Sequence, residues 1–244
     1  MRHCRRPRPH RSTVLWSGCA ARPVLPRPRA RRVSADHRQA FRKLEATAAE
    51  KCQLLAGAVV GATAVLNADD PHVIAMAEGF RGRVLTLGCS PGAILRAEDV
   101  RSPWPERLSF TLHFEALSLP VRTRLCGKHW VSSALAALGA TVAMEMPIER
   151  AIDALAEVAP APGRMSPVSR GGVTFICDDF KAPLWTMDGV FEFLEEAQAP
   201  RKVAVIGTIS NYAASASRIY RSAALRALTV TDEVVSWGPT RSTR

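Results

Sequence analysis

The chain of 244 residues, 47% of them hydrophobic, is long enough for one large domain or two small ones that each bury a core. Its formal net charge of +11 is concentrated at the N-terminus: residues 1–35 hold ten arginines and no acidic residue, and the other 23 Lys and Arg residues nearly balance 22 Asp and Glu residues. The basic character therefore belongs to this leader, which argues against a fold built to bind nucleic acid.

The leader, residues 1–35, is rich in Arg and Pro without apolar periodicity, so we expect it to be disordered. Three interpretations stay open for it: a basic arm for RNA or an anionic membrane surface, a targeting peptide, or a non-functional stretch from a mis-assigned start or a shifted reading frame. The last is favoured, because the leader has no continuous apolar segment, no aromatic interleaving and too many prolines for an amphipathic helix.

From residue 36 onward, the apolar spacing alternates between helical and strand periods. Phe110, Leu112 and Phe114 alternate with polar residues, and we expect Pro120 to break this pattern within an antiparallel hairpin. In chain order, the spacing predicts a helix over 40–56, a strand over 62–67, a helix over 70–80, a strand over 83–88, the hairpin over 108–127, and helices over 129–145 and 147–158.

Residues 159–167, "APAPGRMSP", consist of Pro and small residues and mark a domain boundary. Beyond it, the pattern predicts strands over 173–176, 202–207 and 233–238, separated by helices over 184–197 and 215–228. Such alternation is typical of a parallel sheet with right-handed crossovers. We therefore expect an α/β protein with a disordered leader (1–35), a first unit (36–158) and a second unit (159–244).

The six cysteines form no C-x-x-C pair, so the sequence predicts neither a zinc site nor a dense disulfide framework. Several of them lie in apolar surroundings, and we interpret these as reduced core residues of a cytosolic protein. Since no run of 18 apolar residues exists, no membrane span is expected.

Polar residues follow two of the predicted strands. Asn67, Asp69 and Asp70 follow the first strand in "LNADDP", and "CDDFKAP" (177–183) places two carboxylates and a lysine after the strand 173–176. In open α/β sheets, ligands bind at the carboxyl ends of strands. The alternative for Asp69 or Asp70 is that one of them caps the helix that follows.

Three further segments are weak signals by themselves. His129 opens a helix in "KHW", where it is either a ligand contact or an ordinary first-turn residue beside Trp130, which we expect to pack. Arg164 lies in the boundary segment, where the alternative is a solvated arginine. Gly207 follows a strand and permits a tight turn at the sheet edge.

The order of these segments is more specific than any one of them. His37, Lys51, "LNADDP", "GKHWVSSALAAL", "PGRM", "DDFKAPLWTM" and "VAVIGTI" follow one another in a series that resembles the ATP-dependent Mur ligases, the amide-forming enzymes of peptidoglycan precursor synthesis. The likeness is greatest to the branch that adds a D-alanyl-D-alanine dipeptide, and it spans about residues 36–240. It implies part of a central ATPase domain over 36–158, followed by the start of a Rossmann-like C-terminal domain over 159–244.

The resemblance also implies cofactors and site residues. It places His37 and Lys51 at a catalytic magnesium site, where the family's lysine becomes carbamylated, and an anionic carbamate suits Mg²⁺. For Lys51 the alternative is a solvated helix lysine. It implies ATP and Mg²⁺ as cofactors, and a UDP-muramoyl-peptide-like or amino-acid substrate. The nucleotide-binding residues that it implies are Asn67, Asp69, His129, Arg164, Asp178, Asp179 and Lys181.

The sequence departs from the family pattern at several points. It lacks the Gly-rich loop ending in Gly-Lys-Thr/Ser that cradles phosphates, since its only Gly-Lys pair, Gly127-Lys128, is followed by a histidine. The family's N-terminal UDP-sugar-binding domain has no counterpart. Trp130 and Ser133 stand where the family has asparagines, and "FKAPL" replaces a Tyr-Asn-Ala-Asn-Pro-like segment.

Two functions of different classes follow. The first is a truncated fragment of an ATP-dependent acid–amino-acid ligase of cell-wall precursor synthesis, inactive alone because positioning and charge stabilisation dominate phosphoryl transfer. The alternative is a non-catalytic interaction or regulatory subunit on the same fold, with a partner chain that supplies the phosphate loop. A nucleic-acid binder acting through the leader ranks last.

Overall fold

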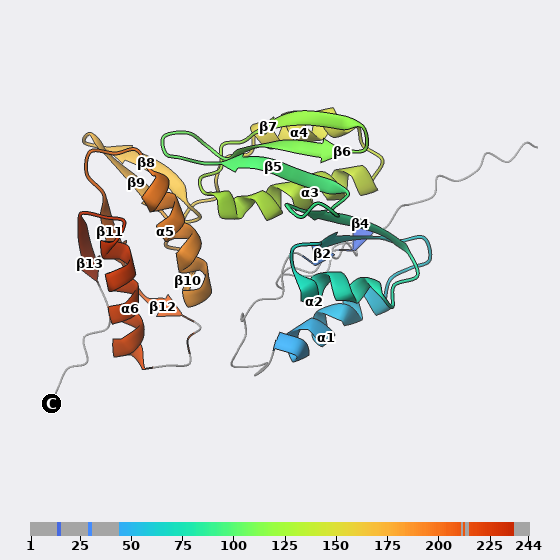
Figure 1. The fold of residues 1–244 in the computed structure, drawn as a ribbon, viewed down its shortest axis with the longest axis horizontal. Coiled ribbons are helices and arrows are strands. Elements are labelled where there is room, and N and C mark those ends of the chain that lie inside the picture. Colours follow the sequence, from blue (N-terminus) through green and yellow to red (C-terminus); the bar gives the residue numbers. More distant parts are fainter. Residues whose placement is uncertain (1–13, 16–28, 31–43, 211, 213–214, 237–244) are drawn as a thin grey trace, which may run out of the picture.

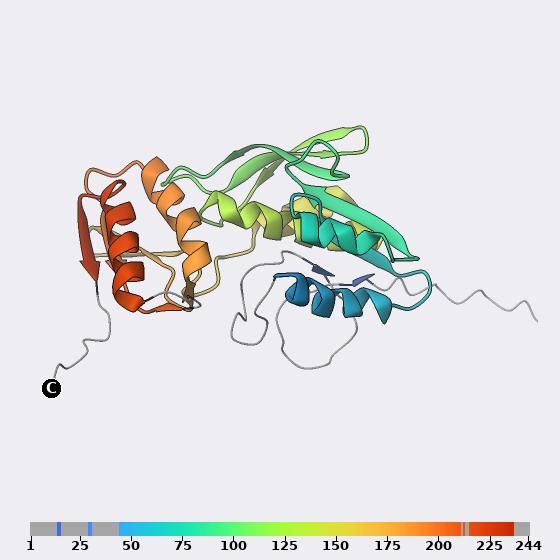
Figure 2. The same ribbon diagram turned by 60° about the horizontal axis from the view of Figure 1, so that its bottom comes forward.

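The computed structural model describes residues 14–15, 29–30, 44–210, 212 and 215–236, which form two α/β units joined by residues 157–165 (Figure 1). The first unit is built on one seven-stranded sheet, and the described part of the second contains three two-stranded sheets. Both views place the second unit beside the first, next to the start of the long helix α3 (Figures 1 and 2). The α/β class that the alternating pattern predicts is confirmed.

The centre of the first sheet is parallel. It contains β3 (Thr63–Asn67), β4 (Arg83–Gly88) and β5 (Leu95–Arg101), and β3 is buried along its whole length. A strand covered on both faces reads as a continuous apolar run rather than an alternating one, which is what its sequence shows. β5 was not expected, because its apolar residues are few and the charged Arg96 and Glu98 face outward.

The other half of the sheet is antiparallel. β6 (Ser109–Phe114) pairs with β5 and with β7 (Leu117–Arg122), so the predicted hairpin is confirmed. The expected break at Pro120 is wrong, because this residue lies inside β7. The strand is at the edge of the sheet, where a residue without an N–H group removes no ladder hydrogen bond.

The N-terminal leader contributes two short strands. β1 (Val14–Leu15) and β2 (Arg29–Ala30) both pair in parallel with β3. At these four residues the structure differs from the disordered leader that composition predicts, because β3 offers backbone groups for pairing at its outer edge. The rest of the leader, and the predicted site residue His37, lie outside the described residues.

Helices cover both faces of the parallel strands. Ala64 and Leu66 of β3 pack toward α1 (Leu44–Ala56), α2 (Pro71–Ile74) and the short helix η1 (Ala75–Ala77). On the opposite face, Val65 packs in the core that includes α3 (Val131–Ala143) and α4 (Ile148–Ala156). The first unit is therefore a three-layer α/β/α structure, which the alternation of side chains along β3 makes possible.

The second unit has its own core, formed by residues from two helices and their neighbouring strands. Its helices are η3 (Leu184–Thr186), α5 (Met187–Glu196) and α6 (Ala216–Leu228), and its parallel strand pairs are β10 (Ala182–Pro183) with β12 (Ile209–Ser210), and β11 (Val203–Ile206) with β13 (Glu233–Ser236).

One strand of this unit does not pair as expected. The segment 173–176 forms β9 (Val173–Cys177), but β9 pairs antiparallel with β8 (Ser166–Arg170) and not within a parallel sheet. The turn between them is Gly171-Gly172, both with positive φ. Two consecutive glycines are a strong hairpin signal, and they outweigh the crossover expected from the order of elements.

A glycine lets α3 lie close to the parallel strands. A Cβ atom added to Gly139 would be 2.8 Å from Cγ1 of Val65, which is itself only 1% exposed. Valine is stiff about χ1, so neither it nor the surrounding packed core can move away at low cost. Gly139 therefore sets how near α3 approaches β3.

We expect Gly139→Ala to destabilise the protein by about 1–2 kcal/mol, although alanine is the better helix former, because the overpacking penalty exceeds the gain in helix propensity. Urea unfolding followed by circular dichroism measures this. Gly79→Ala is the matched control: a Cβ there meets no atom within 4 Å, so its stability should stay within about 0.5 kcal/mol of the parent or rise. Equal effects of both substitutions would contradict the prediction.

Asp69 ties the end of β3 to the loop that follows β4. Its carboxylate accepts hydrogen bonds from the backbone N–H of Cys89 (2.7 Å) and from the N–H (2.8 Å) and hydroxyl (2.6 Å) of Ser90. Gly88 allows this approach, since a Cβ there would lie 2.6 Å from Asp69 Oδ1. One carboxylate therefore holds the carboxyl ends of two neighbouring strands together.

We expect Asp69→Ala to cost about 1–2 kcal/mol of folding free energy, a value reduced by the solvent exposure of these groups. Ser90→Ala removes one of the three hydrogen bonds and should cost less than half as much. Chemical unfolding of both variants measures the difference. If Asp69→Ala were as stable as the parent, the loop would be held by other contacts.

No helix in the described ranges is both long enough and apolar enough to cross a membrane.

Candidate functional site

A pocket of about 360 Å³ opens at the carboxyl end of β3, between the start of α2 and the start of α3. The 3-10 turn η2 (Lys128–Trp130) leads directly into α3. Pockets of this size at the carboxyl edge of parallel strands are a usual place for small ligands in α/β proteins. The lining residues are Asn67, Asp69, Asp70, Pro71, His72, His129, Val131 and Ser132.

The polar residues of the segment "LNADDP" have different structural roles. Asn67 is 4% exposed, and its side-chain oxygen accepts a hydrogen bond from the N–H of Asp69 (3.0 Å). Asp70 accepts from the N–H groups of His72 (3.0 Å) and Val73 (3.3 Å), and it is the N-cap of α2. Asp70 is thus the capping residue, whereas Asp69 holds the neighbouring loop from the rim of the pocket.

The opposite wall of the pocket comes from the start of α3. His129 lies in η2, with its ring centroid 5.7 Å from that of Trp130. Trp130 packs against the main core of the first unit, as expected from the sequence. Ser132 lies one turn beyond His129 on the same helix start and also lines the pocket, a neighbour that helical spacing alone could have indicated.

A second cluster surrounds the end of β9. The backbone N–H of Phe180 donates to the carbonyl of Gly163 (3.2 Å), and the guanidinium of Arg164 lies 4.4 Å from the centroid of the Phe180 ring. Gly163 has a φ of +68°, and a Cβ there would be 2.7 Å from Oδ1 of Asp179. The two carboxylates after β9 therefore meet the backbone and the arginine of the segment that joins the units.

The environment of Asp178 disfavours its charged form. Burial raises the pKa of this carboxyl above its ordinary value, and the negative charge of Asp179 acts in the same direction. A backbone hydrogen bond from Met165 and the charge of Arg164 oppose this rise in pKa. Ionisable groups whose pKa is shifted in this way are often found at functional sites.

The predicted residues thus fall into three groups. Asn67, Asp69 and His129 line one pocket, while Arg164, Asp178 and Asp179 gather at the end of β9. Lys51 is half-buried on α1 and does not line the pocket, and Lys181 is exposed just before β10.

The metal expectation finds no support in the described ranges, where no group of three or more His, Cys, Asp and Glu side chains is placed to hold an ion. It depends on Lys51 and on His37, and the latter lies outside these ranges. The carboxylates of Asp69 and Asp70 already accept hydrogen bonds from backbone N–H groups, so they are not arranged as a free ligand set.

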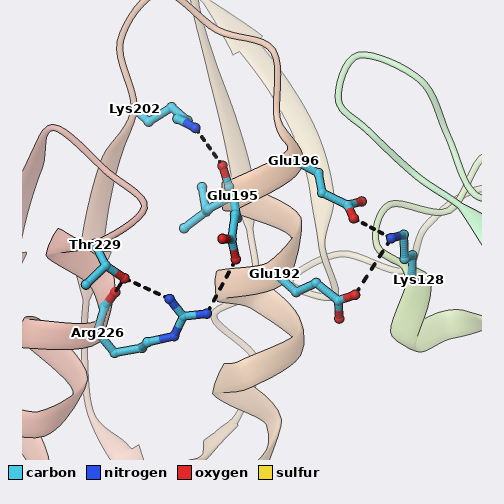
Figure 3. A network of polar contacts seen from close by, with 8 residues as sticks. Lys128, Glu192, Glu195, Glu196, Lys202, Arg226 and Thr229 are labelled. Atoms are coloured by element: carbon cyan, nitrogen blue, oxygen red, sulfur yellow. Dashed lines mark hydrogen bonds and ion pairs between the residues drawn. The ribbon is translucent and has the colours of Figure 1, made fainter.

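Sequence reasoning missed the contact between the two units at this place. Lys128, which precedes His129, forms ion pairs with Glu192 and Glu196 of α5 (Figure 3). Glu192 and Glu196 are four residues apart and so share one face of the helix. That spacing was visible in the sequence, but their partner is more than sixty residues away along the chain.

Comparisons with known proteins agree with this architecture. Residues 31–141 match the model of the Mur ligase middle domain. The UDP-N-acetylmuramoyl-tripeptide–D-alanyl-D-alanine ligase of Mycobacterium tuberculosis is 33% identical over 152 residues, which cover 62% of this chain and 30% of that protein. The UDP-N-acetylmuramoyl-L-alanyl-D-glutamate–2,6-diaminopimelate ligase of Caldanaerobacter subterraneus is 26% identical over 175 residues, 72% of this chain and 36% of that protein.

Solved structures give the same fold. The MurF ligase of Thermotoga maritima, solved in complex with ADP, superposes with a TM-score of 0.70 at 18% identity, covering 85% of this chain and 48% of that one. A MurF structure from Acinetobacter baumannii gives a TM-score of 0.75 at 20% identity over 84% of this chain and 45% of that one. The chain spans about a third of the length of the curated relatives that it matches and about half the length of these structures. Residues 31–141 of the chain therefore resemble a Mur ligase middle domain, and the fold of the chain is that of the Mur ligase structures.

Proposed function

We propose that the chain is part of an ATP-dependent ligase that joins a carboxylate to an amine in cell-wall precursor synthesis, and that its pocket binds the nucleoside part of the nucleotide. The observation that carries this proposal is the convergence of Asn67 and His129 on one pocket at the carboxyl edge of β3, within the Mur ligase middle domain. Such an edge is where open α/β sheets bind ligands.

The pocket has the character that a nucleoside requires. Its volume of about 360 Å³ and its apolar residue Val131 suit the flat face of a base, while Asn67, His129 and Ser132 offer polar edges. The bound nucleotide would supply the phosphoryl group that activates the substrate carboxylate. The role of this part of the chain would be to hold and orient the nucleotide while that group is transferred.

The second unit would complete the site. We propose that residues 36–158 are part of the central domain and that residues 159–244 begin the C-terminal domain, with Arg164 and Asp178 or Asp179 reaching the ribose and phosphates, and Lys181 facing phosphate or a substrate carboxylate. The close packing of Arg164, Phe180 and the two carboxylates supports a single functional cluster at this place.

The magnesium role of His37 and a carbamylated Lys51 stays part of the proposal, as does a UDP-muramoyl-peptide-like or amino-acid substrate. The name of the Mycobacterium tuberculosis relative supports the substrate class, and the match to the Mur ligase middle domain supports the magnesium role. Dependence on ATP would locate this activity in the cytoplasm.

Calorimetric titration with ADP tests the pocket directly. We expect the parent chain to bind ADP, and His129→Ala to bind it about tenfold more weakly, because one lost contact to a base is worth roughly 1–2 kcal/mol. His113→Ala is the matched control: this histidine is paired with Glu98 on the antiparallel half of the sheet, away from the pocket, and its loss should leave ADP binding unchanged. Failure of the parent to bind ADP would contradict the proposed function.

The substitution Asp178→Asn is expected to affect the stability of the fold and the affinity for nucleotide in opposite directions. Because the folded protein raises the pKa of Asp178, ionisation costs stability as pH rises from the ordinary carboxyl pKa through the raised one, and below that window there is no cost. The asparagine variant should therefore be more stable than the parent at pH 7, equally stable at acidic pH, and weaker in nucleotide binding. Thermal unfolding across pH together with ADP titration measures both. A variant less stable at pH 7 would show that the carboxylate is favoured in the fold.

A further inference from the structure

The C-terminal end of α5 concentrates negative charge. Glu195 and Glu196 are its last two residues, and its last turn contains no basic residue. Acidic side chains at this end of a helix are unfavourable, since the unpaired carbonyl groups already make it negative. The helix end therefore requires cations from elsewhere in the fold.

Three cations meet this requirement, and they come from different places (Figure 3). Arg226 of α6 pairs with Glu195 (3.5 Å), and the Lys202 ammonium donates to the carbonyl of Leu194 (2.9 Å), both from within the second unit. The third is Lys128, which pairs with Glu196 and lies 3.8 Å from Glu192, and it belongs to the first unit.

The Lys128 contact is better placed than an ordinary surface ion pair. The side chains of Lys128 and Glu196 are 30% and 32% exposed, so water and salt screen them less than they screen a fully exposed pair. Beside it lies an apolar cluster in which Cys126 of the first unit packs with Met165 of the joining segment and Phe193 of the second unit. The ion pair thus stands at the rim of an apolar contact between the units.

The same helix touches the pocket residue His129. A Cβ atom added to Gly189 of α5 would be 3.1 Å from Nδ1 of His129 and 3.2 Å from its Cβ and Cγ. The imidazole is therefore packed against the α5 backbone itself, and the position of α5 limits the orientations that this ring can adopt. Lys128 and His129 are adjacent in η2, so one short turn carries both the charged contact and the pocket wall.

We propose that Lys128, with Glu192 and Glu196, is an electrostatic clamp that docks the second unit on the pocket and thereby positions His129. Lys128 acts as a positioning residue, through α5 and Gly189. The docking itself is independent of any ligand. Its consequence for nucleotide affinity rests on the proposed function, since a correctly oriented His129 improves binding only if the pocket takes a nucleotide.

The test compares charge variants of the full chain. Lys128→Glu reverses the cation, Lys128→Arg keeps it, and Lys128→Glu combined with Glu192→Lys and Glu196→Lys restores the pair with opposite signs. Arg201→Glu is the matched control, because it causes the same change in net charge and breaks the exposed Arg201–Glu233 pair within the second unit. Small-angle X-ray scattering reports the docking of the units, and the ring signals of ¹³C-labelled histidine report His129.

Lys128→Glu should increase the radius of gyration, shift the His129 ring signals and, if the parent binds ADP, weaken ADP binding about five- to tenfold. In Lys128→Arg and in the charge-swapped triple variant, the radius of gyration, the His129 ring signals and the ADP affinity should lie close to the values of the parent. Arg201→Glu should change none of these three quantities. High salt should reproduce part of the effect in the parent.

The proposal is overturned if Lys128→Glu keeps its circular dichroism and matches Arg201→Glu in scattering and in the His129 signals. If Lys128→Glu alone fails to fold, the triple variant decides: recovery of the parent's scattering supports the clamp, and an expanded triple variant with parent-like circular dichroism refutes it. If the parent does not bind ADP, the proposed function fails, while scattering and histidine signals still decide on the clamp.

Discussion

The packing of α3 on the parallel strands β3 and β4 is the constraint on which the site depends. β3 is buried on both faces, so its length and direction are fixed by two helical layers at once. Gly139 lets α3 approach Val65 closely, and this approach places η2 at the carboxyl edge of the sheet. The pocket exists because a helix start and a strand end are brought to the same edge, and neither could form it alone.

The polar residues at that edge serve structure and site together. Asp70 caps α2, and Asp69 holds the loop after β4, so both carboxylates accept hydrogen bonds from backbone N–H groups. Through these hydrogen bonds, the rim of the pocket is rigid before any ligand arrives. A preorganised rim reduces the entropic cost of binding, which is the usual reason for building a site on the ends of regular elements.

In the second unit, acidic side chains lie at places where a negative charge is unfavourable. Partial burial raises the pKa of Asp178, and the end of α5 collects glutamates that its own last turn does not neutralise. Both arrangements cost stability locally, and both lie where the second unit meets the joining segment or the first unit. Local costs of this kind are expected at functional junctions rather than in the middle of a core.

The sequence by itself determined the class of the fold, the helices α1, α3, α4, α5 and α6, the antiparallel hairpin and the resemblance to the Mur ligases, because apolar periodicity and the order of short motifs are local properties of the chain. It also indicated Asn67 and Asp69, since ligands bind at the carboxyl ends of strands in α/β sheets, and the resemblance to the Mur ligases implied His129. It did not determine that β9 pairs with β8, because a Gly-Gly turn and a crossover compete and only the folded chain resolves them. Only the tertiary structure decided that Asp69 holds the loop after β4, that Lys128 meets α5, and that His129 packs on Gly189, because these contacts join residues far apart in the chain through distances of a few ångströms.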